Sequence, residues 1–176
     1  SEGASAYGVA QSISPGATVH IVDEKDGIRI NATATINTVS TASDGISVGI
    51  SSDNTQNGSL APKGVVSISE AVVNSVAKNG GSAVAVHLQN QGYITLGSST
   101  LNAFSEDGKA VGIYNDNSTL NLDGNTLVTA ETALAGSGGT INVGKDATVI
   151  LNGTIDKDKW SGTSVSYTHL TLPTNS

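Results

Sequence analysis

The 176-residue sequence has no cysteine and no methionine, and it has only one tryptophan and one phenylalanine. The absence of cysteine excludes a disulfide framework and a cysteine metal site. No apolar run approaches the ~20 residues that a membrane-spanning helix needs. Charged residues make up 13% of the chain, and the formal net charge of −7 argues against binding to nucleic acid or to an anionic membrane surface.

Small polar residues and glycine are abundant, a composition that the chain shares with many disordered sequences. Disordered chains, however, lack β-branched residues and usually carry dense charge. Here Val, Ile, Thr and Leu recur at regular intervals along the chain. We therefore expect a packed structure, and the length suits one domain.

Apolar residues alternate in short bursts, which is the period-two pattern of a strand with one buried face. The bursts themselves repeat. Four successive units each open with an alternating apolar pair, and they start 28, 26 and 21 residues apart. The four pairs are Val66 and Ile68, Ile94 and Leu96, Leu120 and Leu122, and Ile141 and Val143.

Each unit continues with a second apolar position, a turn and a third alternating segment. The second position falls five residues after the opening pair, at Val73, Leu101 and Leu127. Turns rich in glycine follow at 79–81 and 107–108, where glycine adopts positive φ without steric cost. Three short strands in each repeat of about 20 to 28 residues predict an all-β parallel β-helix with about six or seven rungs.

This pattern predicts both the domain organisation and the core. We expect the β-helix to occupy residues 1–160, with a protruding loop near 51–63, which shows no alternation and contains Pro62. Equivalent apolar side chains of successive rungs should stack into one interior column. The expected structural core comprises Val66, Ile68, Ile94, Leu96, Leu101, Val111, Ile113, Leu120, Leu122, Leu127, Ile141 and Val143.

The last part of the chain has a different character. The segment VSYTHLTLPT at 165–174 resembles the translation of an adapter used to prepare sequencing libraries, and the chain starts at Ser1 without an initiator methionine. We therefore expect the ends to be those of a sequencing fragment. Residues 161–176 are expected to form a non-native or disordered tail.

Several units of the repeat resemble the passenger domain of bacterial autotransporters, such as adhesins and related surface proteins. The resemblance rests on DGKAVGIYNDNSTLNL at 107–122, STLNLDGNTLVTA at 118–130 and GGTINVGKDATVILNG at 138–153, together with the lack of cysteine. It implies a right-handed β-helix that is exported by a signal peptide and a C-terminal outer-membrane β-barrel. It also implies display on a Gram-negative cell surface, where the partners are a host-surface protein or glycan, or a second copy of the chain.

Parallel β-helices also include polysaccharide lyases and hydrolases, which need clustered carboxylates, often with calcium, and a basic residue. Arg29 is the single arginine, and its isoleucine neighbours indicate an outward-pointing strand residue. Acidic residues cluster at Asp23, Glu24 and Asp26, and again at Glu106 and Asp107. Solvated turns explain these clusters better than a cation site does.

The histidines and tyrosines also have two interpretations. His20 and His87 occupy alternate strand positions between apolar neighbours, so we interpret them as surface residues and not as metal ligands. Tyr7, Tyr93 and Tyr114 fall near strand ends, where they either fill corners, which we favour, or form a small aromatic contact surface. We therefore assign no catalytic residue, metal ligand or cofactor.

The leading hypothesis is a noncatalytic extracellular stalk or adhesin segment of an autotransporter passenger domain, with segment 51–63 as its contact element. One alternative is a polysaccharide lyase or hydrolase of the pectate-lyase-like class. Another is a two-partner-secreted, hemagglutinin-like exoprotein, which shares the fold but uses a separate transporter.

Overall fold

The computed structural model describes residues 6–13, 27–54, 65–156, 165–166 and 170–171, and in these residues the chain is all-β without a helix. Every strand pairing in them is parallel. The strands are β1 (Ala6–Ile13), β2 (Gly27–Ser40), β3 (Ile46–Asn54), β4 (Val65–Ala77), β5 (Ser82–Gln89), β6 (Tyr93–Ser105), β7 (Ala110–Leu122), β8 (Thr126–Val143), β9 (Val149–Ile155), β10 (Val165–Ser166) and β11 (Leu170–Thr171).

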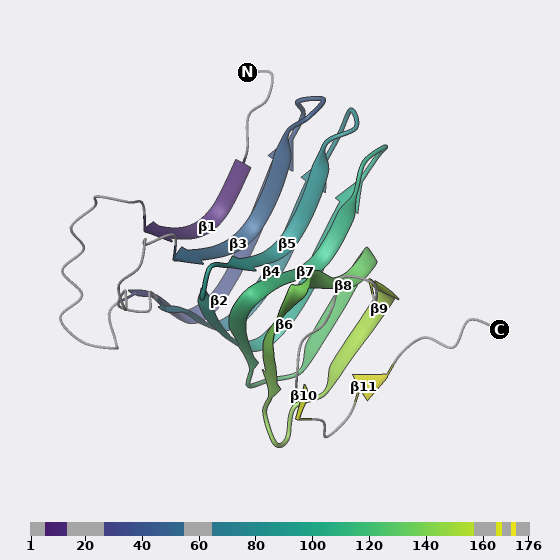
Figure 1. Cartoon of the computed structure of the whole chain (residues 1–176). Coiled ribbons are helices and arrows are strands. Elements are labelled where there is room, and N and C mark those ends of the chain that lie inside the picture. The colour runs from purple at the N-terminus through teal and green to yellow at the C-terminus, as the bar shows by residue number, and fades with distance from the viewer. Residues whose placement is uncertain (1–5, 14–26, 55–64, 157–164, 167–169, 172–176) are drawn as a thin grey trace.

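The chain winds around an axis, so that each segment pairs with segments one circuit earlier and one circuit later (Figure 1). Three sides can be followed. The first comprises 27–30, 65–68, 93–96, 119–122 and 140–143, and the second comprises 33–40, 70–77, 98–105, 126–129 and 149–152. The third comprises 6–13, 46–54, 82–89, 110–115, 132–135 and 154–155. The arrangement is that of a parallel β-helix or a similar solenoid.

The strands are longer than the expectation of three short strands per circuit. β4 and β6 each continue from the first side onto the second, and β8 runs through 18 residues that cover parts of all three sides. Backbone pairing therefore persists around several corners. Where it does stop, as between β4 and β5, the turn contains Asn79 at φ 54° and Gly80 at φ 83°. Glycine and asparagine are the residues that adopt this left-handed conformation most readily.

A column of aliphatic side chains fills the interior. Val66, Ile94, Leu120 and Ile141 are stacked by direct pairing on the first side, and each is buried. Burial of one such side chain stabilises the fold by roughly 1.5–3 kcal/mol. Nine of the twelve side chains expected in the core are buried, namely Val66, Ile68, Ile94, Leu96, Leu101, Ile113, Leu120, Leu122 and Ile141.

The prediction for Leu127 is wrong, because this side chain is 39% exposed and the neighbouring Val128 is fully buried in its place. Val128 pairs with Leu101, which occupies the equivalent position one circuit earlier. Two residues, 97 and 98, separate the paired positions Leu96 and Ser99, whereas three residues, 123–125, separate their partners Leu122 and Thr126. One extra residue moves the following side chains to the opposite face of the sheet.

Val111 and Val143 are only partly buried. A Cβ on Gly112 would lie 2.2 Å from Cγ1 of Val128, so Gly112 points inward and Val111, one residue earlier, points outward. Alternation is broken after Gly112, since the next residue, Ile113, is buried as well. Val143 lies at the end of β8 and packs against the core with only part of its side chain buried.

Part of the interior is polar. The hydroxyls of Thr38, Ser47 and Ser75 are buried, and they hydrogen-bond to one another. Ser47 Oγ donates to Thr38 Oγ1 at 2.8 Å, and Ser75 Oγ donates to the carbonyl oxygen of Ser47 at 2.8 Å. Because buried hydroxyls are costly only when they lack a partner, this cluster is tolerated inside the helix.

Two predicted boundaries differ from the structure. Residues 51–54 of the expected loop belong to strand β3, and residues 55–63 lie outside the described residues. In the segment expected to be a non-native or disordered tail, β10 pairs with β8 and β11 pairs with β9. The rest of 161–176 lies outside the described residues.

The register of the second side can be tested with a matched pair of leucine substitutions. Leu101→Ala should lower the free energy of unfolding by about 2–5 kcal/mol, because it leaves a cavity in the core. Leu127→Ala should lower it by less than about 1 kcal/mol, because the side chain is already partly in water. Urea denaturation followed by circular dichroism measures both values. Equal losses would show that the register is wrong.

Candidate functional site

The residues that sequence analysis raised for catalysis or metal binding do not converge in the part of the chain that the structure describes. No group of three or more His, Asp or Glu side chains lies close enough there to hold a metal ion. Arg29 lies in β2, where its backbone pairs with Ser67. Glu106 and Asp107 are exposed in the turn between β6 and β7. The remaining candidates, His20, Asp23, Glu24 and Asp26, lie outside the described residues.

Polar residues gather instead at the corner between the third and first sides, which we call the third corner. It contains residues 90–92, 116–118 and 136–139 from three successive circuits. Asn90, Gln91 and Asn117 have φ values of 55°, 64° and 47°, in the left-handed region that non-glycine residues rarely adopt. The backbone N–H of Gln91 donates to the carbonyl oxygen of Asn117 at 3.2 Å, which joins two of the circuits.

The corner must turn sharply in the third of these circuits. Gly136 has φ 127°, and a Cβ there would lie 1.9 Å from the carbonyl oxygen of Asn115. Only glycine fits this close approach of two backbones. Asn115 is itself buried, and its Nδ2 donates to the carbonyl oxygen of Thr140 at 3.3 Å. The side chain of Asn115 thus connects the third side to the start of the next circuit.

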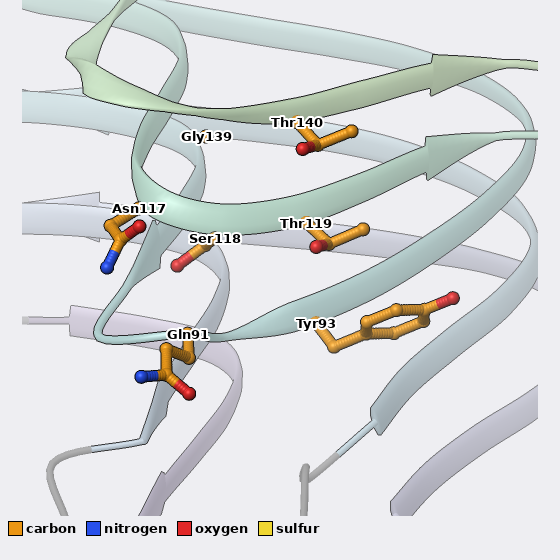
Figure 2. A pocket seen from close by; sticks show the side chains of 7 residues that line it. All are labelled: Gln91, Tyr93, Asn117, Ser118, Thr119, Gly139 and Thr140. Carbon is orange, nitrogen blue, oxygen red and sulfur yellow. The ribbon is translucent and has the colours of Figure 1, made fainter. Parts of the chain in front are cut away.

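A shallow groove of about 180 Å³ lies at this corner (Figure 2). Its walls carry amide, hydroxyl and phenol groups, and none of its side chains is charged. The lining residues are Gln91, Tyr93, Asn117, Ser118, Thr119, Gly139 and Thr140. Each of these polar groups can donate or accept a hydrogen bond, which suits a ligand with several hydroxyls.

Tyr93, Thr119 and Thr140 form one outward column along the groove because they pair in register. In Figure 2 the three side chains lie one above another, with Tyr93 below Thr119 and Thr119 below Thr140. The Tyr93 hydroxyl accepts a hydrogen bond from Nδ2 of Asn121 at 2.7 Å, and this bond fixes the ring. An aromatic ring held next to hydroxyl and amide groups can pack against the apolar face of a sugar, while its neighbours bond the sugar's hydroxyls.

Carboxylates border the groove without lining it. Asp53, at the end of β3, accepts hydrogen bonds from Nε2 of Gln89 at 2.7 Å and from Nδ2 of Asn90 at 2.8 Å. Asp116 accepts a hydrogen bond from the hydroxyl of Ser137. These bonds tie consecutive circuits together at the corner. The chain that leaves Asp53 continues into segment 55–64, so the expected contact loop departs from the same corner as the groove.

The three tyrosines have different surroundings. Tyr93 lines the groove, while Tyr114 stacks on His87 with ring centroids 5.1 Å apart and an interplanar angle of 16°. Tyr7 pairs with Val48 through its backbone in β1. At the third corner Tyr93 therefore lines the groove, and Tyr114 belongs to a stacked pair with His87.

His87 is more enclosed than a surface histidine. Burial lowers the pKa of its imidazole below the usual 6.5, although the negative charges of Asp53 and Asp116 partly oppose this effect. Burial makes the charged form of the imidazole costly, so the folded chain takes up a proton at His87 less readily than the unfolded chain does. His87 points outward between the buried Val86 and Leu88, as expected, but its side chain is only partly exposed.

Comparison with known proteins finds no matching family model, curated protein or solved structure. In the described residues no helix is long and apolar enough to cross a membrane.

Sequence reasoning missed most of the groove because its residues are neighbours only across circuits. Gln91 and Thr140 are far apart in the chain, yet both line it. Tyr93 was one of three equivalent tyrosines, and nothing in its local sequence marked it above the others. To predict the groove, one would need to know how the third side of one circuit is positioned relative to the first side of the next, and the local sequence does not contain this information.

Stability between pH 5 and 7 should report on His87. Its folded-state pKa lies below the unfolded value, so as the pH falls through 6.5 the unfolded chain takes up a proton and the folded chain does not. The free energy of unfolding should therefore decrease as the pH is lowered from 7. The decrease should level off once the pH is below the folded-state pKa of His87. His87→Phe retains a ring for Tyr114 but removes this proton. Urea denaturation across that range should give a flatter curve for the variant than for the unaltered chain, and parallel curves would contradict the assignment.

Proposed function

We propose that this chain is a noncatalytic segment of an extracellular β-helical stalk and adhesin, of the kind that autotransporter passenger domains form. In this proposal the helix is right-handed with six or seven rungs, and it stands on the surface of a Gram-negative bacterium. The third corner contacts a neutral glycan or a glycosylated protein on another cell. The uncharged groove around Tyr93 is the observation that carries the proposal.

The architecture supports a stalk because each circuit is held by the circuits on either side. Buried aliphatic side chains stack along the inside, and parallel backbone pairing continues from β1 to β9. Such stacking gives a rod whose length grows with the number of repeats and whose outer surface is free to vary. A rod of this kind can hold a contact site away from a cell surface.

The groove supports adhesion because its chemistry matches a sugar. A hexose presents adjacent hydroxyls and a face of C–H groups, and the groove offers amides and hydroxyls beside an aromatic ring. The bordering carboxylates, Asp53 and Asp116, disfavour an acidic ligand at this corner. A neutral glycan is therefore the best match among surface ligands.

The register of the strands defines a clean test of the contact loop. Asp53 pairs with Gln89, and Val65 pairs with Tyr93. The eleven residues 54–64 therefore make a connection that the next circuit makes with the three residues 90–92. Replacing 54–64 with the sequence Asn-Gln-Gly should shorten the corner and leave the strands in place.

Adhesion can be measured with fluorescent beads that carry the full chain, applied to cultured epithelial cells. We expect the shortened corner and Tyr93→Ala each to reduce bead binding by about tenfold, the effect of losing roughly 1.4 kcal/mol. Both variants should retain the circular dichroism spectrum of the unaltered chain. Tyr93→Phe keeps the ring and should retain most of the binding.

Glu106→Ala is the control, because it changes an exposed turn at a different corner. It should bind as the unaltered chain does. Treatment of the cells with glycosidases should remove the binding of the unaltered chain. If beads carrying the unaltered chain bind no better than beads carrying serum albumin, the adhesin proposal is wrong.

A further inference from the structure

The outer surface of the second side has an unusual composition. Alternate side chains point outward there, and strand pairing places them in four parallel columns. The first column, Thr33, Glu70 and Ser98, contains a carboxylate. We call the surface formed by the other three columns the amide face. Its columns are Thr35, Val72, Thr100, Leu127 and Ile150; Asn37, Asn74, Asn102, Thr129 and Asn152; and Val39, Val76 and Phe104.

The amide face holds most of the exposed apolar surface. Among the described residues, five large hydrophobic side chains are exposed, and four of them, Val39, Phe104, Leu127 and Ile150, belong to this face. Phe104 is 61% exposed. The fifth, Ile46, lies at the start of β3 on the third side. Clustering of apolar side chains in this way marks an interaction surface better than isolated exposed residues do.

A ladder of asparagines runs between the two apolar columns. Nδ2 of Asn74 donates to Oδ1 of Asn37 at 2.9 Å, and Nδ2 of Asn102 donates to Oδ1 of Asn74 at 2.9 Å. Each amide nitrogen carries two N–H groups and each amide oxygen accepts two hydrogen bonds, so the ladder uses only part of this capacity. The remaining capacity includes both donors and acceptors, which makes the ladder complementary to an identical ladder.

The face is also uncharged. None of its three columns contains Asp, Glu, Lys, Arg or His, although the chain has 15 acidic and 8 basic residues. Two copies with a net charge of −7 repel each other, and the repulsion is weakest when each presents an uncharged surface to the other. Glu70 lies in the adjoining column, but the face itself offers no charge opposite to that of a basic protein or an anionic membrane.

We propose that two copies of this chain associate through their amide faces. In a two-fold arrangement the same patch meets itself, so the asparagine ladders hydrogen-bond to each other and the apolar columns pack on either side. Stacked sheets lie about 10 Å apart with interdigitating side chains. Leu127, which sequence analysis placed in the core, is then part of the contact.

The expected contact is weak and reversible. Outward columns lie about 6.8 Å apart and neighbouring strands about 4.8 Å apart, so the patch measures roughly 20 by 24 Å. Two such patches bury on the order of 1,000 Å² in total, at the lower limit for specific association. Longer rods with more circuits would gain strength through the same pattern.

Sedimentation velocity of the full chain from about 10 μM to 1 mM tests the proposal in the concentration range expected for a weak interface. The unaltered chain should shift from monomer toward dimer as its concentration rises. Leu127→Glu and Phe104→Glu should each weaken the dimer by at least about tenfold, because they place a charge in the contact. Ile46→Glu is the matched control, since Ile46 is 41% exposed and lies on another side, and it should leave association unchanged.

Because these 176 residues contain no cysteine, an introduced cysteine gives a second measurement that is independent of folding stability. Asn102 is the middle member of the asparagine column, so Asn102→Cys should lie near the two-fold axis and form an intermolecular disulfide on mild oxidation. Ile46→Cys should remain unlinked under the same conditions.

A monomer at every concentration would overturn the proposal, as would equal association of Leu127→Glu and the unaltered chain. Cellohexaose is the probe for the competing occupant, a neutral glycan. If the chain stays monomeric and Leu127→Glu abolishes cellohexaose binding, the face binds sugar and not a second copy. Loss of cell adhesion in the Tyr93 variants without a change in association would separate this proposal from the adhesin function.

Discussion

Parallel pairing in register is the constraint on which the rest of this structure depends. Each strand segment directs its backbone hydrogen bonds to the circuits before and after it, so side chains at equivalent positions stack directly on one another. Each side chain is therefore in contact with the side chains at the equivalent positions of the circuits before and after it. Aliphatic side chains gather on the inside in this way, as Val66, Ile94 and Leu120 do. Polar side chains form ladders on the outside.

The same constraint creates surfaces that no single repeat possesses. The groove at the third corner takes residues from three circuits, and its ring is held by a hydrogen bond from Asn121 to Tyr93. The amide face takes its residues from five segments of the second side. One surface is a concave polar site at a corner, and the other consists of three uncharged columns on one side of the rod. The two can act independently because they lie on different parts of the rod's circumference.

Much of the fold could be predicted because the relevant signal is local. The alternation of Ile94 and Leu96, and of Leu120 and Leu122, is visible within a few residues and indicates a strand with one buried face. The prediction failed where a count of corner residues mattered. One additional residue before Thr126 brought Val128 inside and Leu127 outside, and no pattern within that segment reports how a corner is formed. The groove could not be predicted at all, because stacking alone brings Gln91 to Thr140.

The sequence by itself determined the strand pattern, the repeat and the apolar positions of most circuits, since these follow from side-chain periodicity. Only the tertiary structure decided which outward side chains become neighbours. It set the position of each circuit relative to the next and formed the groove around Tyr93. It also aligned Asn37, Asn74 and Asn102 into a ladder. The physical reason is that periodicity fixes the side of a strand on which a residue lies, whereas lateral neighbours depend on the length and conformation of every corner in between.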